Sequence, residues 1–168
     1  MATTRFKGNP VQTCGNIPAV GSKAPEAVLT GGDLADVKIS GFAGSNIVLN
    51  IFPSVDTSVC ATSIRRFNEA AASLSNAKVL CISRDLPFAQ KRFCGAEGIA
   101  NVTMLSEMRG DSFGQAYGVR LVDGPLAGLF ARVVVVIDAN GKVAHAQLVG
   151  EIAEEPDYEA VLSCLKAL

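Results

Sequence analysis

The sequence has little of what marks several common classes of protein. No run of about eighteen apolar residues occurs in the 168-residue chain, so a membrane-spanning helix is not expected. The formal net charge is only -1, which argues against a nucleic-acid partner because phosphate binding needs a basic surface. The N-terminal segment MATTRFKGNP has no apolar signal region, and we therefore expect a cytoplasmic protein.

Cysteine and histidine are also sparse, and their spacing argues against several kinds of site. The chain has one histidine, His145, and five cysteines, none of them in a CxxC pair: Cys14, Cys60, Cys81, Cys94 and Cys164. This spacing disfavours a structural zinc site and a CxxC disulfide reductase. A chain that is 49% hydrophobic can build its core without disulfides, so any cysteine chemistry should be catalytic or redox.

The apolar pattern predicts one α/β domain over residues 1–168 that is rich in strands. An N-terminal hairpin is expected from Arg5–Lys7 and Val11–Thr13, with GNP at its turn. Two short strands are expected around Gly31–Gly32. Apolar runs predict five further strands: Asn46–Phe52, Ala77–Ser83, NVTMLS, Arg132–Asp138 and Lys142–Val149. The segment ANG between the last two of these is a typical hairpin turn.

Helices are expected between these strands. Apolar residues recur every three or four positions from Ser58 to Leu74, with Arg65 and Glu69 paired on the solvated side. The segment DLPFAQKRFCG predicts a short helix that Asp85 caps, and that ends before Gly95. Further helices are expected in DSFGQAYGV and Pro156–Lys166. The β-α-β order implies parallel strands, and the late hairpin adds antiparallel ones, so we expect a mixed sheet with helices on both faces.

The segment FPSVDTSVC places a thiol where a strand gives way to a helix. Cys60 falls in the first helical turn, where free N–H groups and the helix dipole favour the thiolate. Pro53 ends the strand because it has no N–H to donate. Thr57 can direct its hydroxyl to the sulfur or to a substrate, or it can cap the helix.

Arg132 opens the apolar segment RVVVVID and is a candidate partner for this thiol. A thiolate that attacks an O–O bond needs hydrogen-bond donors around both oxygens and a cation near the developing charge. A guanidinium suits this task because it stays charged and presents several N–H groups. The alternative is that Arg132 pairs with a carboxylate and has only a structural role.

At this point the sequence resembles a known family. The pattern Pro53-x-x-x-Thr57-x-x-Cys60 is similar to the active-site signature of the peroxiredoxins. The segments LNIFPSVDTSVCATSIRRFN, SRDLPFAQKRFCGAEG, GPLAGLFARVVVVID and PDYEAVL resemble the bacterial thiol peroxidases, which are atypical two-cysteine peroxiredoxins. The resemblance covers essentially the whole chain. It implies a thioredoxin-like fold extended by the N-terminal hairpin.

The resemblance also implies a set of roles. Cys60 would be the peroxidatic cysteine and Cys94 the resolving one, with Pro53, Thr57 and Arg132 at the other active-site positions. It implies a homodimer, reduction by thioredoxin, and a preference for alkyl hydroperoxides over hydrogen peroxide. No metal, haem or flavin cofactor is needed for this chemistry. In the implied cycle, peroxide oxidises one thiol to a sulfenic acid, the other thiol forms a disulfide with it, and thioredoxin reduces that bond.

Two expectations concern the reduced state. Cys94 lies near the C-terminal end of its helix, where the dipole disfavours a thiolate. A disulfide needs Cα atoms within about 7 Å, so cysteines on separate helices should require local unwinding around Cys60, Cys94 or both.

Other readings of the residues stay open. One is a cysteine hydrolase with Cys60 and His145 as a dyad, and another is a redox sensor without rapid turnover. Cys81 is expected to be a buried strand residue, Cys164 is expected to pack in the last helix, and Cys14 has no assigned role. Phe113 and Tyr117 are expected to be core residues rather than part of a pocket.

Overall fold

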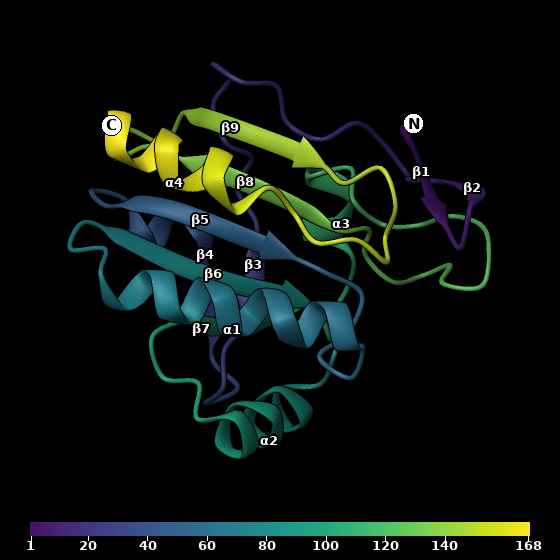
Figure 1. The fold of residues 1–168 in the computed structure, drawn as a ribbon, viewed down its shortest axis with the longest axis horizontal. Coiled ribbons are helices and arrows are strands. Elements are labelled where there is room, and N and C mark those ends of the chain that lie inside the picture. The colour runs from purple at the N-terminus through teal and green to yellow at the C-terminus, as the bar shows by residue number, and fades with distance from the viewer.

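The computed structural model describes residues 1–168, and its strands form a seven-stranded sheet and a separate hairpin (Figure 1). The strands are β1 Thr3–Phe6, β2 Asn9–Gln12, β3 Val28–Thr30, β4 Asp36–Lys38, β5 Asn46–Ile51, β6 Ala77–Ser83, β7 Thr103–Ser106, β8 Val133–Ile137 and β9 Val143–Leu148. Their order in the large sheet is β4-β3-β7-β6-β5-β8-β9, and β1 pairs with β2.

The helices cover both faces of this sheet. They are the short 3-10 helix η1 Ile39–Phe42, α1 Ser58–Ala72, α2 Pro87–Glu97, α3 Ser112–Ala116 and α4 Tyr158–Ala167. Side chains of α1, α2 and α4 join one hydrophobic cluster, and side chains of η1 and α3 join the other. Figure 1 shows α1 and α4 in front of the sheet and α2 at the foot of the molecule. The expected mixed sheet with helices on both faces is confirmed.

The strand directions follow from the connections between strands. Strand β5 runs parallel to β6, and β6 runs parallel to β7, with helices as crossovers. Strand β8 is antiparallel to both β5 and β9. Because β5 is buried on both faces, its residues alternate between the clusters, with Leu49 and Ile51 on one side and Val48 on the other. Because β5 and β8 are antiparallel and Ile51 lies opposite Val133, the C-terminal end of β5 lies beside the first residues of β8. The candidate active site is located at this end of the sheet.

The hairpin turn lies earlier than the sequence indicates. Lys7 and Gly8 occupy the turn with φ of 53° and 81°, and Pro10 lies within β2. Two successive residues with positive φ give the twist that a two-residue hairpin needs. The pair Lys7–Gly8 therefore makes the turn, and the prediction that placed it at GNP was wrong by about one residue.

The boundaries of α2 also differ from the prediction. Its N-cap is Leu86, which makes no side-chain cap, and Pro87 lies in the first turn as expected. The helix continues through Gly95 and ends at Gly98, whose φ of 66° gives the left-handed C-cap. Cys94 still lies in the last turn, because its carbonyl accepts hydrogen bonds from the residues that close the helix.

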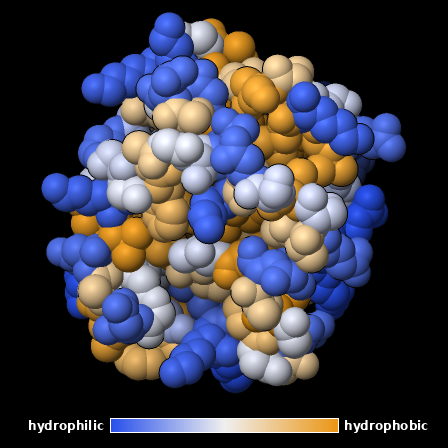
Figure 2. Space-filling model, turned by 90° about the vertical axis from the view of Figure 1, so that its left-hand side faces the viewer, coloured by the Kyte–Doolittle hydropathy of each residue, from blue (hydrophilic) through white to orange (hydrophobic).

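The sheet end where β5 begins lies far from the C-terminal end of that strand. Hydrophilic and hydrophobic groups interleave over this side of the molecule (Figure 2). A pocket of about 280 Å³ opens here, and Glu26, Ile47 and Asn140 are among its lining residues. This pocket is at the opposite end of the sheet from Cys60. None of the helices is long and apolar enough to cross a membrane.

Candidate active site

Cys60 lies in the first turn of α1 with its side chain fully buried. Thr57 is the N-cap residue, with φ -98° and ψ 144°, and its Oγ1 accepts a hydrogen bond from the Cys60 backbone N at 3.4 Å. The Thr57 hydroxyl donates to the Ser54 carbonyl at 3.3 Å. Of the two alternatives for Thr57, the structure shows the helix cap.

Arg132 reaches the Cys60 sulfur from the start of β8. Its Nη2 donates to Cys60 Sγ at 3.2 Å, and its Nε donates to the Ile152 carbonyl at 2.8 Å. The whole residue is only 1% exposed, and its Nη1 is buried with no hydrogen-bond partner. Arg132 forms no ion pair with a carboxylate. A buried guanidinium without a counter-ion therefore faces the thiol directly.

This arrangement concentrates positive charge and N–H donors at one sulfur. Coulombic stabilisation is stronger in a buried site than in water, so negative charge that develops at Cys60 is stabilised by Arg132. Arg132 Nη2 donates to the sulfur, and the N–H groups of Arg132 Nη1 have no hydrogen-bond partner. Such a site can stabilise both a nucleophilic sulfur and an oxygen that approaches it.

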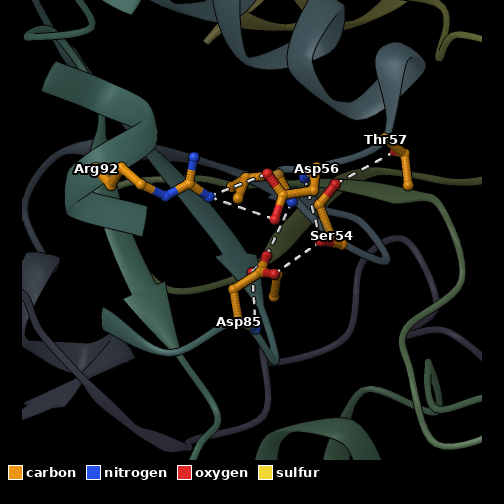
Figure 3. Close-up of polar contacts among 7 residues, drawn as sticks. Ser54, Asp56, Thr57, Asp85 and Arg92 are labelled. Carbon is orange, nitrogen blue, oxygen red and sulfur yellow. Dashed lines mark hydrogen bonds and ion pairs between the residues drawn. The ribbon is translucent and has the colours of Figure 1, made fainter. Parts of the chain in front are cut away.

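The turn before α1 is held by Asp85, a residue that the sequence predicts as a helix cap (Figure 3). The Asp85 carboxylate accepts from Ser54 Oγ at 2.8 Å, from the Val55 backbone N at 2.9 Å and from Ser83 Oγ at 2.6 Å. The cap prediction was wrong, because Leu86 is the N-cap of α2 and the Asp85 carboxylate binds groups outside that helix. This carboxylate instead fixes the segment that leads into Cys60.

Asp85 can do this because of the strand pairing. Strand β6 runs parallel to β5, and the Phe52 backbone N donates to the Ile82 carbonyl at 3.2 Å. The residues that follow both strands therefore emerge side by side. Pro53, which is buried, ends β5 at this point as expected.

Two exposed ion pairs connect the Cys60 region to α2. Arg92 Nη2 lies 3.1 Å from Asp56 Oδ1, and Figure 3 shows this side chain extending from α2 toward the turn. Arg65 Nε lies 2.9 Å from Glu97 Oε2. The expected pair of Arg65 with Glu69 was wrong, because Arg65 extends to the neighbouring helix instead.

Cys94 is partly buried in α2 and packs at the edge of the hydrophobic cluster that contains Cys60. Burial raises the pKa of the Cys94 thiol above its ordinary value. Both Cys60 and Cys94 are free thiols in regular helix, so the structure represents the protein before any disulfide forms.

None of the other three thiols has a hydrogen bond with Arg132. Cys81 is fully buried in β6, and burial raises its pKa to about 12, as expected of a packed strand residue. Cys164 is half-buried in α4, and Cys14 donates a hydrogen bond from Sγ to the Gly114 carbonyl at 3.3 Å. Phe113 and Tyr117 are both fully buried and stack at 4.5 Å, which confirms them as core residues.

His145 does not form a dyad with Cys60. It lies on β9 opposite Val136, whereas Arg132 precedes the other end of β8. At about 3.3 Å per strand residue, the four positions between Arg132 and Val136 span roughly 13 Å. No hydrogen bond joins His145 to the thiol, and its Nε2 is buried without a partner. No group of three or more His, Cys, Asp or Glu side chains is placed to hold a metal ion.

Comparisons with known proteins agree with this geometry. Residues 19–162 match the Redoxin family model. The thiol peroxidase of Mycobacterium tuberculosis is 59% identical over 99% of this chain and 100% of its own. That of Corynebacterium glutamicum is 57% identical over 98% of this chain and 99% of its own.

Solved structures show the same fold. A peroxiredoxin-like protein from Aquifex aeolicus superposes with a TM-score of 0.94 at 44% identity, covering 99% of this chain and 97% of that one. The thiol peroxidase from Chromobacterium violaceum shares the fold with a TM-score of 0.91 at 21% identity, over 99% and 97% of the two chains. The chain therefore belongs to the thiol peroxidases of the Redoxin family, which are peroxiredoxin-type enzymes that reduce peroxides at the expense of a thiol.

Proposed function

We propose that Cys60 is the peroxidatic cysteine and Cys94 the resolving cysteine of a thioredoxin-dependent peroxidase formed by one domain, residues 1–168. The observation that carries the proposal is the 3.2 Å contact between Arg132 Nη2 and the fully buried Cys60 sulfur. No other thiol of the chain has a cation as hydrogen-bond partner.

In the first step the Cys60 thiolate attacks the terminal oxygen of the hydroperoxide. A sulfur–oxygen bond forms, the O–O bond breaks, and its electron pair leaves on the second oxygen as alkoxide or hydroxide. That oxygen takes a proton and departs as alcohol or water, while Cys60 becomes a sulfenic acid. The free N–H groups of Arg132 Nη1 donate to the peroxide oxygens, and the Thr57 hydroxyl turns from the Ser54 carbonyl to donate as well.

Pro53 shields this step from water. It is buried and lies between the end of β5 and the turn that Asp85 holds. Because Pro53 has no N–H, it leaves no unpaired donor beside the reacting oxygens.

In the second step Cys94 attacks the sulfenic sulfur, water leaves, and a Cys60–Cys94 disulfide forms. Both cysteines lie in helices, so the first turn of α1, the last turn of α2 or both unwind before the sulfurs meet. The raised pKa of Cys94 keeps this thiol protonated and unreactive until then. Thioredoxin then reduces the disulfide by thiol–disulfide exchange, and the site returns to the form described here.

Apolar side chains near the site support a preference for alkyl hydroperoxides over hydrogen peroxide. Val55 is buried in the turn, and Leu86 and Phe88 at the start of α2 are 54% and 65% exposed. Exposed side chains of this size also suit a second subunit, which supports a homodimer. A cytoplasmic location stays a prediction from the sequence.

The test is NADPH oxidation coupled through thioredoxin reductase and thioredoxin, with cumene hydroperoxide and hydrogen peroxide as substrates. Cys60→Ser should abolish turnover, and Cys94→Ser should abolish turnover with thioredoxin while Cys60 still reacts once. Cys14→Ser is the matched control, because serine can keep the hydrogen bond to the Gly114 carbonyl. Turnover that survives Cys60→Ser would overturn the proposal, and a single oxidation without turnover in the unmodified protein would favour a redox sensor.

A further inference from the structure

We infer that Glu151 is a positioning residue for the peroxidase reaction, and that it acts by holding the Ile152 carbonyl, and thereby Arg132, against the N-terminal hairpin. The inference rests on the proposed role of Arg132 at Cys60. It links a carboxylate near the molecular surface to the sulfur through three successive contacts, each given by the structure.

The first contact fixes the guanidinium. Arg132 has two hydrogen-bond partners for its side chain, the Cys60 sulfur and the Ile152 carbonyl, and Nη1 has none. The carbonyl is thus the one oxygen that orients the guanidinium plane. A shift of Ile152 moves the N–H groups that face the sulfur, and hydrogen bonds weaken steeply with misalignment.

The second set of contacts fixes Ile152 on β1. The Ile152 backbone N donates to the Arg5 carbonyl at 2.8 Å. Thr4 Oγ1, which is buried, donates to the Val149 carbonyl at 2.7 Å. Two hydrogen bonds therefore attach the segment between Val149 and Ile152 to the hairpin, while the Val149 backbone N donates to the Arg132 carbonyl at 3.0 Å.

The third set of contacts belongs to Glu151. Its carboxylate accepts from the backbone N of Lys7 at 3.2 Å and of Gly8 at 3.0 Å, the two turn residues of the hairpin. It also accepts from the Ala153 backbone N at 3.2 Å. One carboxylate thus joins the hairpin turn to residues on both sides of the Ile152 carbonyl.

Apart from the burial of the Ile152 side chain in the core and the hydrogen bond from the Val149 backbone N to the Arg132 carbonyl, few contacts support the residues around Glu151. Residues 150–155 form neither helix nor strand, so no ladder of backbone hydrogen bonds holds them in place. Without the carboxylate, the Lys7 and Gly8 N–H groups turn to water, and the segment keeps only its Arg5 and Thr4 contacts with the hairpin. We expect the Ile152 carbonyl then to move away from the position that Arg132 requires.

The experiment measures the second-order rate of Cys60 oxidation by cumene hydroperoxide in stopped flow. Glu151→Ala should lower this rate by about 10-fold to 100-fold, since misplacement of a catalytic group by about 1 Å has effects of that order. Glu151→Gln keeps an acceptor oxygen and should recover most of the rate. Glu154→Ala is the matched control, because it removes the same charge from a nearby glutamate that is exposed and makes no side-chain hydrogen bond.

A double-mutant cycle separates positioning from general loosening of the fold. Glu151→Ala should lower the rate less than about twofold when Arg132→Lys has already removed the guanidinium. Thr4→Val removes a different contact of the same segment and should slow the reaction in the same way. An equal effect of Glu151→Ala in both backgrounds, or an effect no larger than that of Glu154→Ala, would overturn the inference. Full activity of Arg132→Lys would instead contradict the proposed role of Arg132.

Discussion

Replacing Asp85 by alanine should both destabilise the protein and slow the reaction of Cys60 with peroxide. The carboxylate accepts three hydrogen bonds, from Ser54, Val55 and Ser83, at 2.8, 2.9 and 2.6 Å. The Ser54 hydroxyl is partly exposed and can turn to water, whereas the fully buried Ser83 hydroxyl can only rotate toward another buried acceptor. The Val55 backbone N can do neither, because Val55 is only 2% exposed.

The expected loss of stability depends mainly on the hydrogen bond from the Val55 backbone N, which has no other acceptor to turn to. A buried N–H left unpaired costs about 1–3 kcal/mol, and each lost hydrogen bond to a charged group contributes about 1.5–3 kcal/mol before the hydroxyls find other partners. We therefore expect Asp85→Ala to lower the free energy of unfolding by roughly 3 kcal/mol. Because Thr57 caps α1 from the same turn, the peroxide reaction should slow by about 10-fold or more.

Denaturant unfolding and stopped-flow oxidation of Cys60 measure the two effects. Asp85→Asn is the control, since an amide oxygen can still accept from the Val55 N–H, and it should lose no more than about 1 kcal/mol. If Asp85→Ala unfolds at the same denaturant concentration as the unmodified protein and reacts at the same rate, the reasoning about this turn is refuted.

Three further predictions concern Cys94 and the ion pairs of α2. Because burial raises the pKa of Cys94, its alkylation by iodoacetamide in the Cys60→Ser variant should need a higher pH than that of a free thiol; peptide mass spectrometry measures this, and equal midpoints would contradict it. The same shift predicts that stability falls as pH rises above the ordinary thiol value, because the unfolded thiol ionises first. Arg92→Ala and Arg65→Ala should each speed disulfide formation after oxidation by about 1.4-fold to fivefold, since exposed ion pairs contribute about 0.2–1 kcal/mol to the folded helices. Rapid acid quenching would follow this step, and Lys91→Ala, which removes a charge from α2 without breaking an ion pair, should leave it unchanged.

Most of the fold could be predicted from the sequence, because the sequence patterns that indicate its helices and strands are local. The apolar run of β5, the proline that ends it and the threonine three residues before Cys60 all act within one short segment. Arg132 could be chosen because a charged residue at the start of an apolar strand stands out. These features predict the helix start and the thiol without knowledge of any distant contact.

The remaining parts of the site depend on contacts between distant segments. Asp85 contacts Ser54 and Val55 only because β5 and β6 pair in parallel with aligned ends. An aspartate two residues before a proline at a helix start is also typical of a cap, so the local signal favoured the wrong role. Nothing in the sequence near Glu151 indicates that its carboxylate binds a turn more than a hundred residues away. Likewise, Arg65 prefers Glu97 over Glu69 because α1 and α2 are neighbours in space.

The central claim is that Cys60 is oxidised first and that Cys94 resolves it. The most direct measurement treats the reduced protein with one equivalent of cumene hydroperoxide and maps the products by peptide mass spectrometry. We expect a single Cys60–Cys94 disulfide in the unmodified protein, and a dimedone adduct on Cys60 alone in the Cys94→Ser variant. A first oxidation at Cys14, Cys81 or Cys164, or a disulfide that leaves Cys94 free, would contradict the account.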